Sequence, residues 1–194
     1  MSLGFKKEVK LISDALDEAI NPRNKTPGAR PRLVFAAAGN WGLNNSLAFP
    51  ASKKGVICVH ATSGNGYDAQ FSPKSGEPMK NFPIGTLGIT IQSEWGGKPV
   101  WLQGTSYATP IAAAVAANVL ELARQNLDPG MQSELTRFRG MKAVLRLMCK
   151  HGNDPSYQYC APWVLYEKMV KNEKICTTAQ ICKAIEHEID ELNY

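Results

Sequence analysis

The pattern of hydrophobic and polar positions in the first third of the chain predicts one helix followed by two buried strands. In LISDALDEAI, residues 11–20, the apolar positions recur with the period of a helix, and Asn21-Pro22 ends it. The continuous apolar runs LVFAAAGN at 33–40 and GVICVHAT at 55–62 are typical of strands that are buried on both faces of a parallel sheet. Because helix and buried strand alternate, the pattern predicts an α/β fold with a mostly parallel sheet.

The middle of the chain predicts a hairpin and one long helix. GITIQSEW and KPVWLQGTS flank Gly96-Gly97, so they predict a β-hairpin that turns on the two glycines. The Ala-rich stretch that follows predicts a helix over about 106–125. Pro110 is expected in the first turn of that helix, where a missing backbone N–H costs little.

The last third of the chain predicts two further helices, over about 134–150 and 178–192. Thr177 or Thr178 would cap the second of them, because a threonine side chain accepts hydrogen bonds from the first backbone N–H groups of a helix. The sequence contains neither repeats nor a change of composition that would mark a second domain. We therefore expect residues 1–194 to form one domain.

The composition is that of a globular protein. With 44% hydrophobic and 20% charged residues, the chain is neither disordered nor fibrous. Its net charge of +5 is modest, and a mildly basic surface is much commoner than a nucleic-acid site, so the basic loop at 21–32 is interpreted as a solvated connection. No apolar run has membrane-spanning length, and the first ten residues do not resemble a signal peptide. We expect neither nucleic acid nor a membrane as a partner.

The cysteines do not predict a disulfide scaffold, because their number is odd and their positions are scattered. They also lack the Cys-x-x-Cys spacing of a zinc site, so we expect no metal there. Reduced thiols are the simpler interpretation and favour an intracellular location. The five cysteines are Cys58, Cys149, Cys160, Cys176 and Cys182.

The stretch QGTSYATP, residues 103–110, carries candidate chemistry. A serine at the start of a buried helix lies at the positive end of the helix dipole, among backbone N–H groups without a partner in the helix. Such a place can stabilise a negative oxygen that develops on a substrate carbonyl. Gly104 allows a sharp turn from strand to helix and the close approach of a substrate backbone. The alternative is that Ser106 only caps a core helix.

A second candidate follows the first buried strand. Asn40 comes directly after the strand, so its side-chain amide can project toward the same place as Ser106. The Asn40 amide and the backbone N–H of Ser106 would then form an oxyanion hole with two donors. The alternative is that Gly39-Asn40 is a simple turn, since asparagine tolerates left-handed backbone geometry.

LVFAAAGN, then FPAS with GVICVHAT, then GTSYATP resemble, in this order and at this separation, the C-terminal half of a subtilisin-like serine peptidase. The Gly-Thr-Ser-x-Ala-x-Pro signature is highly specific, and the strand that ends in Ala-Gly-Asn matches independently. The likeness covers about residues 1–125, and the helices at about 134–192 would close the domain. The resemblance implies a three-layer subtilisin-like fold with its N-terminal half absent, so that residues 1–194 form a partial subtilase domain.

The resemblance also implies a role for individual residues in the hydrolysis of a peptide or protein substrate. Ser106 would be the nucleophile that forms the acyl-enzyme, and Asn40 the side-chain donor to the oxyanion. MSLG resembles the strand along one wall of the family's substrate cleft, although a frayed N-terminus is an equal alternative. The implied substrate-binding residues are Ser2, Leu3 and Gly4, which would pair with the substrate backbone, Ala37, Ala38 and Gly39, which would line the pocket for the residue before the scissile bond, and Gly104. No cofactor is expected; calcium is common in the family, but no site can be placed here.

The acid and the base of the family are missing. They precede this region as a strand ending in Asp-Thr-Gly or Asp-Ser-Gly and a helix that begins with His-Gly-Thr, and neither motif occurs. His60 lies within a strand, His151 at the end of a predicted helix and His187 on a late helix, so none has the required context. In subtilisin itself, loss of the serine or the histidine lowers kcat about a millionfold, roughly 8 kcal/mol of barrier.

Three functional interpretations remain open at this point. The chain is part of a serine endopeptidase, a non-catalytic peptide-binding module that has lost its base, or a half-domain that another chain completes with Asp and His. We favour the first, because both retained segments fit the catalytic geometry. A parallel sheet cut beside MSLG would expose a long apolar edge, so we expect this chain alone to associate or to be poorly soluble.

Overall fold

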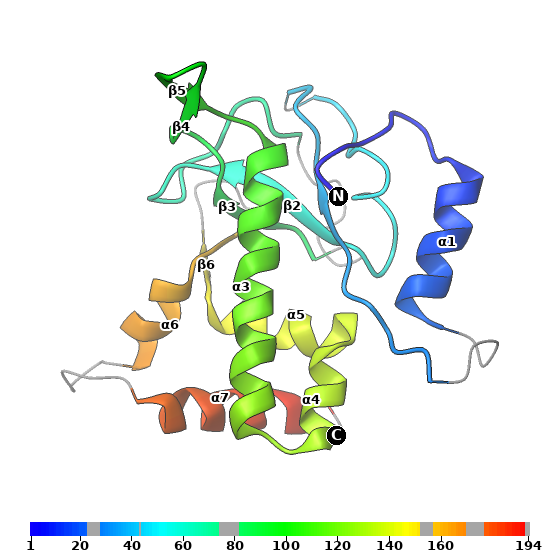
Figure 1. Ribbon diagram of the computed structural model, residues 1–194, viewed down its shortest axis with the longest axis vertical. Coiled ribbons are helices and arrows are strands. Elements are labelled where there is room, and N and C mark those ends of the chain that lie inside the picture. Colours follow the sequence, from blue (N-terminus) through cyan, green and yellow to red (C-terminus); the bar gives the residue numbers. More distant parts are fainter. Residues whose placement is uncertain (23–27, 43, 74–81, 152–156, 170–176, 193–194) are drawn as a thin grey trace.

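The fold contains both helices and strands, with most of the strands in the first two thirds of the chain and most of the helices after them (Figure 1). The computed structural model describes residues 1–22, 28–42, 44–73, 82–151, 157–169 and 177–192. Along the first two thirds lie α1 (Lys10–Ile20), β1 (Phe35–Ala37), β2 (Ile57–Thr62), β3 (Ile84–Leu87), β4 (Ile91–Trp95), β5 (Lys98–Leu102) and α3 (Thr105–Asn126). After them come α4 (Pro129–Leu135), α5 (Phe138–Leu147), β6 (Cys149–His151), β7 (Gln158–Cys160), α6 (Pro162–Met169) and α7 (Thr178–Asp190).

The central sheet has the strand order β1-β2-β3-β7-β6. β1, β2, β3 and β7 are parallel, with Phe35 opposite Ile57 and Val59 opposite Ile84, whereas β6 joins the edge antiparallel to β7. The apolar runs at 33–40 and 55–62 supply β1 and β2, as predicted. The prediction of an α/β fold with a mostly parallel sheet is therefore confirmed.

Helices cover both faces of this sheet. Successive residues of a strand point to opposite faces, so β1 and β2 each contribute to two apolar clusters. On one face, Ile57 packs in the main core with Ala108 and Ala112 of α3. On the other face, Ala36 lies in a second cluster with Leu16 of α1. The predicted three-layer arrangement is confirmed.

Helix α3 confirms the predicted long helix and packs against β1, β2 and β3. It begins at Thr105, so Pro110 is its sixth residue and lies in the second turn, not in the first turn as predicted. The proline ring is exposed. Its missing N–H would otherwise donate to the carbonyl of Ser106, four residues earlier, so the start of α3 lacks one ordinary helical bond.

The expectation that no apolar run has membrane-spanning length does not hold for α3. The helix is 22 residues long, and a window of it has a mean hydropathy of 1.2, so by length and composition alone it could cross a membrane. Its buried alanines lie against the sheet, with Ala108 fully buried and Ala116 almost so. This packing is typical of the core helix of a globular domain.

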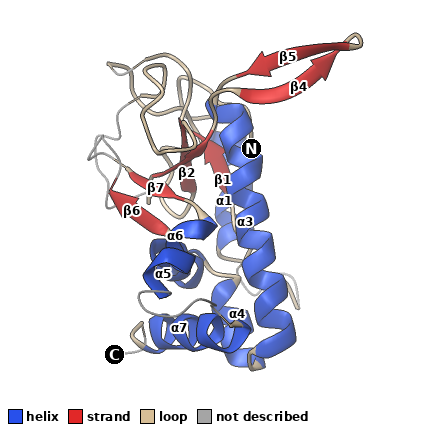
Figure 2. Ribbon diagram, turned by 90° about the vertical axis from the view of Figure 1, so that its left-hand side faces the viewer, coloured by secondary structure: helices blue, strands red, loops and turns tan. Residues whose placement is uncertain are grey.

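The predicted hairpin is confirmed, and it projects from the body beside the N-terminal end of α3 (Figure 2). Trp95 and Lys98 are opposite each other next to the turn, and Trp95 is 82% exposed. Gly96 and Gly97 have φ angles of +58° and +75°, a region that glycine adopts without strain.

The single helix predicted over 134–150 is wrong. The segment contains the end of α4, the whole of α5 and most of β6, because the chain turns at Thr136 and Arg137. A Cβ on Gly140 would lie 2.3 Å from the carbonyl oxygen of Glu134. Helix α5 therefore crosses the end of α4 so closely that only glycine fits.

The first and last helices are found where the pattern predicts them, as α1 and α7. Of the two candidate caps for α7, Thr177 is the one used. Its side chain accepts a hydrogen bond from the Gln180 N–H at 3.3 Å, while the Gln180 side-chain oxygen accepts one from the Thr177 N–H at 2.8 Å. Residues 23–27 of the basic loop, and Cys176, lie outside the described residues.

Candidate active site

The chain enters α3 through Gly104, whose conformation leaves room for a neighbouring amide. Its φ is +147°, and its N–H donates to the Gly88 carbonyl just after β3 at 2.8 Å. A Cβ at this position would lie 3.3 Å from Nδ2 of Asn40. A glycine here thus keeps the Asn40 amide and the start of α3 in close contact.

Asn40 is held by the residue before Ser106. Its Oδ1 accepts hydrogen bonds from the Thr105 N–H at 2.9 Å and from the Thr105 hydroxyl at 3.0 Å. Two donors at that position identify the atom as the amide oxygen, so Nδ2 is the atom left to donate elsewhere. The hydroxyl oxygen of Thr105 also accepts from the Gly39 N–H at 3.3 Å, which ties the end of β1 to α3.

Thr105 is a residue that the sequence reasoning missed. It is fully buried and makes all three of these bonds, although it touches no surface of the cleft itself. The signal that could have identified it is its place between Gly104 and Ser106 in the Gly-Thr-Ser motif. A hydroxyl there can reach back to the strand that carries Asn40.

Ser106 is the second residue of α3 and is partly exposed. Its hydroxyl donates to the backbone carbonyl of Ser2 at 2.8 Å. Helix geometry provides no acceptor within the helix for the N–H of a second residue. The structure therefore places a hydroxyl and an N–H of Ser106 at the positive end of a 22-residue helix.

The N-terminal segment is docked against the sheet, so the interpretation as a frayed end is wrong. The Ala37 N–H donates to the Met1 carbonyl at 3.0 Å, and the N-terminal ammonium of Met1 donates to the Phe35 carbonyl, the pattern of a parallel neighbour of β1. Phe5 and Phe49 exchange two backbone bonds of 2.8 and 2.9 Å. Burial lowers the pKa of the Met1 ammonium.

The remaining predicted substrate-binding residues divide between surface and interior. Leu3 is 55% exposed and Gly4 is also exposed, while a Cβ on Gly4 would lie 2.6 Å from that of Ala48. Ala37 and Ala38 are buried, and Ala38 packs in the second cluster, with α1. The structure brings together Ser2, Gly39, Asn40, Gly104 and Ser106.

None of the three histidines is the hydrogen-bond partner of the Ser106 hydroxyl, which donates to Ser2. His60 is fully buried in β2, with Nε2 3.5 Å from the sulfur of Cys58. His151 lies on β6, so its predicted place at a helix end is wrong, and His187 is exposed on α7. Within the described ranges, no group of three or more His, Cys, Asp or Glu is placed to hold a metal ion.

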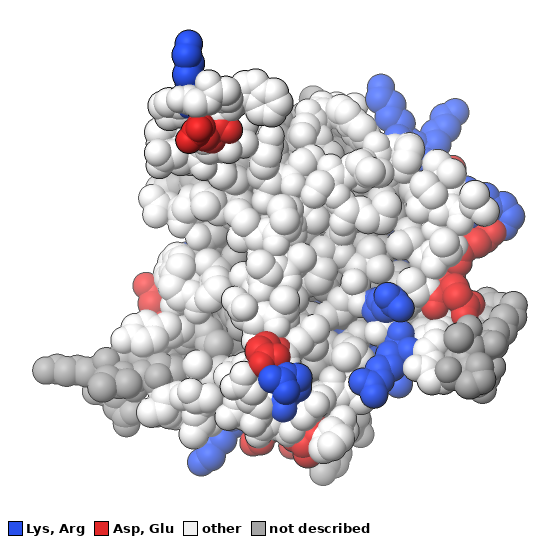
Figure 3. Space-filling view, in the orientation of Figure 1, with Lys and Arg blue, Asp and Glu red and all other residues white. Residues whose placement is uncertain are grey.

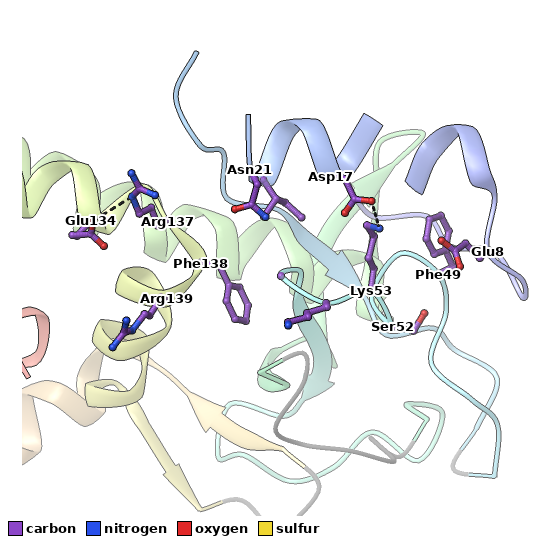
Figure 4. A pocket seen from close by; sticks show the side chains of 13 residues that line it. Glu8, Asp17, Asn21, Phe49, Ser52, Lys53, Glu134, Arg137, Phe138 and Arg139 are labelled. Carbon is purple, nitrogen blue, oxygen red and sulfur yellow. Dashed lines mark hydrogen bonds and ion pairs between the residues drawn. The ribbon is translucent and has the colours of Figure 1, made fainter. Parts of the chain in front are cut away.

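A cavity of about 970 Å³ lies between α1, the loop after Phe49 and the α4–α5 turn, and its lining includes neither Ser106 nor Asn40 (Figure 4). Lys53 bonds to Asp17 at 2.9 Å across one wall, and Arg137 bonds to Glu134 at 3.2 Å on the other. Much of the charge around this cavity is therefore neutralised by its own walls.

Comparison with known proteins relates this chain to the subtilases. The sequence profile of the subtilase family matches residues 1–147. A thermostable alkaline protease of Halalkalibacterium halodurans is 37% identical over 108 residues, 55% of this chain and 27% of that protein. An intracellular serine protease of Paenibacillus polymyxa is 27% identical over 162 residues, 81% of this chain and 45% of that protein. The chain thus spans less than half the length of either relative.

Solved structures share the fold. The patellamide maturation protease PatA superimposes with a TM-score of 0.62 at 24% identity, over 87% of this chain and 61% of that one. A cold-adapted subtilisin-like serine proteinase gives a TM-score of 0.60 at 21% identity, over 82% of this chain and 52% of that one. Since the family profile matches well over half of the chain and the parallel three-layer fold agrees with it, this chain belongs to the subtilase family.

Proposed function

We propose that this chain is the nucleophile-bearing part of a subtilisin-like serine endopeptidase domain. Ser106 attacks the scissile carbonyl and forms the acyl-enzyme, while the Asn40 amide and the Ser106 backbone N–H stabilise the oxyanion. The Asp and His that activate the serine come from outside these 194 residues, either from another segment of the same protein or from a partner chain.

The orientation of the Asn40 amide is the observation that carries this proposal. Both bonds from Thr105 end on Oδ1, at 2.9 and 3.0 Å, and so hold Nδ2 ready as a donor before any substrate arrives. A donor fixed in advance costs no reorganisation when charge develops, which is what an oxyanion hole requires. A simple Gly-Asn turn would not need a buried threonine to fix the amide.

The substrate is proposed to bind as an extended peptide along Ser2, Leu3 and Gly4. Addition of a strand to an exposed backbone segment gives affinity through main-chain bonds and leaves side chains to set specificity. The 2.8 Å bond from the Ser106 hydroxyl to the Ser2 carbonyl supports this proposal, because it joins the proposed nucleophile to the proposed peptide-binding segment.

A non-catalytic peptide-binding module is the second candidate, and one observation favours it. The hydroxyl of Ser106 donates to a backbone carbonyl, so within this chain it is oriented by the cleft wall rather than by an imidazole. A serine without a base is a weak nucleophile, but the same cleft could still bind a peptide.

Active-site labelling separates these candidates. The chain is co-expressed with the N-terminal half of a subtilase domain that carries the Asp and His motifs, co-purification is verified, and the complex is treated with a fluorophosphonate. We expect labelling of wild type and of the exposed-surface control Ser133→Ala, but not of Ser106→Ala. A complex that forms yet resists the reagent would favour the binding module.

A further inference from the structure

Two cysteines face each other across the β6–β7 pair at the far edge of the sheet. The register places Cys149 directly opposite Cys160, and both are thiols in this structure. They are 5% and 4% exposed, on strands of only three residues each, and β6 is the edge strand. No part of the proposed active site contains either of them.

The hydrogen-bond pattern identifies the kind of cross-strand pair. The Ala161 N–H donates to the Met148 carbonyl at 2.9 Å, so Met148 and Ala161 form a hydrogen-bonded pair. Bonded and non-bonded pairs alternate along an antiparallel ladder, which makes Cys149 and Cys160 a non-hydrogen-bonded pair. The Cα atoms of such a pair are about 4.5 Å apart, and disulfides span Cα separations of about 4.4–6.8 Å.

The side chains of this pair also point to the same face. Directly opposite residues have Cβ atoms roughly 4.5–5.5 Å apart, with non-hydrogen-bonded pairs the closer, and a disulfide needs roughly 3.5–4.5 Å. Closure therefore requires a shift of about an ångström or less by these figures. A three-residue edge strand, bonded on one side only, can make such a shift more readily than a central strand.

The other described cysteines are less suited to this chemistry. Cys58 is fully buried in β2, where burial raises the pKa of its thiol far above the ordinary range. Cys182 lies on α7, where burial and then the charge of Glu186 raise the pKa of its thiol. Neither has a cysteine opposite it in a strand pair, since Cys58 lies opposite Ala36 and Cys182 lies on a helix.

We propose that Cys149 and Cys160 form a reversible disulfide by exchange with an oxidised low-molecular-weight disulfide. The thiolate of one cysteine attacks the small disulfide, forms a mixed disulfide and releases one small thiolate. The second cysteine loses its proton, attacks the protein sulfur of the mixed disulfide and releases the second small thiolate. One small disulfide is reduced to two thiols for each protein disulfide formed.

This bond would fasten a hairpin that braces one end of the sheet. The Tyr157 hydroxyl, just before β7, donates to Asp68, and the Tyr159 hydroxyl of β7 donates to the Gly64 carbonyl at 2.6 Å. Both acceptors lie in the loop after β2. Asn40 follows β1, and the loop follows β2, which is parallel to β1. The braced loop and the proposed oxyanion donor therefore both begin at the carboxyl ends of these strands. The proposal itself does not depend on the role of Ser106.

Oxidation of the full chain by oxidised glutathione tests the proposal. After the remaining thiols are blocked with N-ethylmaleimide, peptide mapping should find a crosslink between the peptides of Cys149 and Cys160, with the loss of two hydrogens. The melting temperature should rise by roughly 5–10 °C and return on reduction, because the bond closes a loop of about a dozen residues in the unfolded chain.

Two variants keep the test specific. Cys160→Ala should remove both the crosslink and the glutathione-dependent rise in melting temperature, whereas Cys182→Ala should retain both. If Cys160→Ala does not fold, peptide mapping of the oxidised wild-type chain still tests whether the Cys149–Cys160 crosslink forms. A stable glutathione adduct on Cys149 or Cys160, a crosslink to Cys176 or Cys182, or no reaction of the folded chain would each overturn the proposal.

Discussion

The oxygen and the nitrogen of the Asn40 side-chain amide have separate roles. Its Oδ1 accepts from Thr105, and its Nδ2 is the proposed oxyanion donor. Asn40→Asp keeps an oxygen for Thr105 and removes the donor. In the completed domain, we expect fluorophosphonate labelling of Ser106 to slow about 100- to 1,000-fold, the cost of losing one oxyanion donor. The rate is measured by quenching the labelling reaction at intervals.

The matched control for this change is Asn45→Asp. Asn45 is a nearby, exposed asparagine whose amide donates to the Trp41 carbonyl. The substitution Asn45→Asp adds the same negative charge near the cleft without affecting the bonds of Thr105. The labelling rate of this variant should therefore stay near that of wild type. Equal slowing in both variants would show that added negative charge, rather than the lost donor, is the cause.

Gly104→Ala should displace Asn40 as well as strain the backbone. The control is Gly97→Ala in the hairpin turn, because Gly97 also has a positive φ. A Cβ on Gly104 would lie 3.3 Å from Nδ2 of Asn40, whereas a Cβ on Gly97 would have no neighbouring atom within 4 Å. Each substitution should lower the free energy of unfolding by about 1–3 kcal/mol in urea titrations. Only Gly104→Ala should also slow labelling of Ser106; unchanged labelling would contradict the contact.

At this scale the sequence predicted the residues with exposed chemistry but not the residue that organises them. Ser106 and Asn40 stand in short motifs, and the structure brings both to the start of α3. Thr105 stands in the same motif as Ser106, but its role depends on bonds to residues about 65 positions earlier in the chain. Pairings over that distance follow from the fold, not from local spacing.

At the scale of elements, α7 offers a sharp test of a cap. Thr177 and Gln180 form a reciprocal pair of bonds at its start, and the helix buries Ile185 and Ile189. Thr177→Ala should lower the free energy of unfolding by about 1 kcal/mol, since the first turn loses an acceptor for its N–H groups. Thr178→Ala, one residue later in the same helix, should change it far less. Urea denaturation measures both, and equal effects would contradict the assignment of the cap.

Elements were predictable where their own pattern was long and periodic, and not where distant contacts decide. α1 and α3 have such patterns, whereas β6 has three residues and exists through its pairing with β7. β3 contains Gly85, which weakens the strand pattern. A Cβ there would lie 2.6 Å from the Tyr157 ring and 2.7 Å from Cγ2 of Thr62, so the glycine is required by neighbours that no local pattern indicates.

At the scale of the whole molecule, the β1 edge of the sheet borders an apolar groove. β1 is an edge strand, and its outer side pairs with Met1 through Phe35 and Ala37, the first and last residues of the strand. Beside that edge, a groove of about 350 Å³ runs between Leu33 and Phe35 on one side and Ala117 of α3 on the other. Figure 3 shows the surface over α3 and the adjoining β1 as largely uncharged, with charged side chains gathered toward its rim. An apolar groove beside a strand at the edge of a sheet is a candidate surface for association.

We therefore expect the 194-residue chain, prepared alone, to self-associate with increasing concentration in sedimentation and light-scattering experiments. Ala117→Lys should weaken this association about tenfold or more, because a charge buried in the contact loses its hydration and 1.4 kcal/mol already corresponds to a factor of ten. Ala114→Lys makes the same change on an exposed position of α3 that does not line the groove, and should have little effect. A chain that stays monomeric at every concentration would show that the edge is protected, and equal effects of both lysines would place the contact elsewhere on α3.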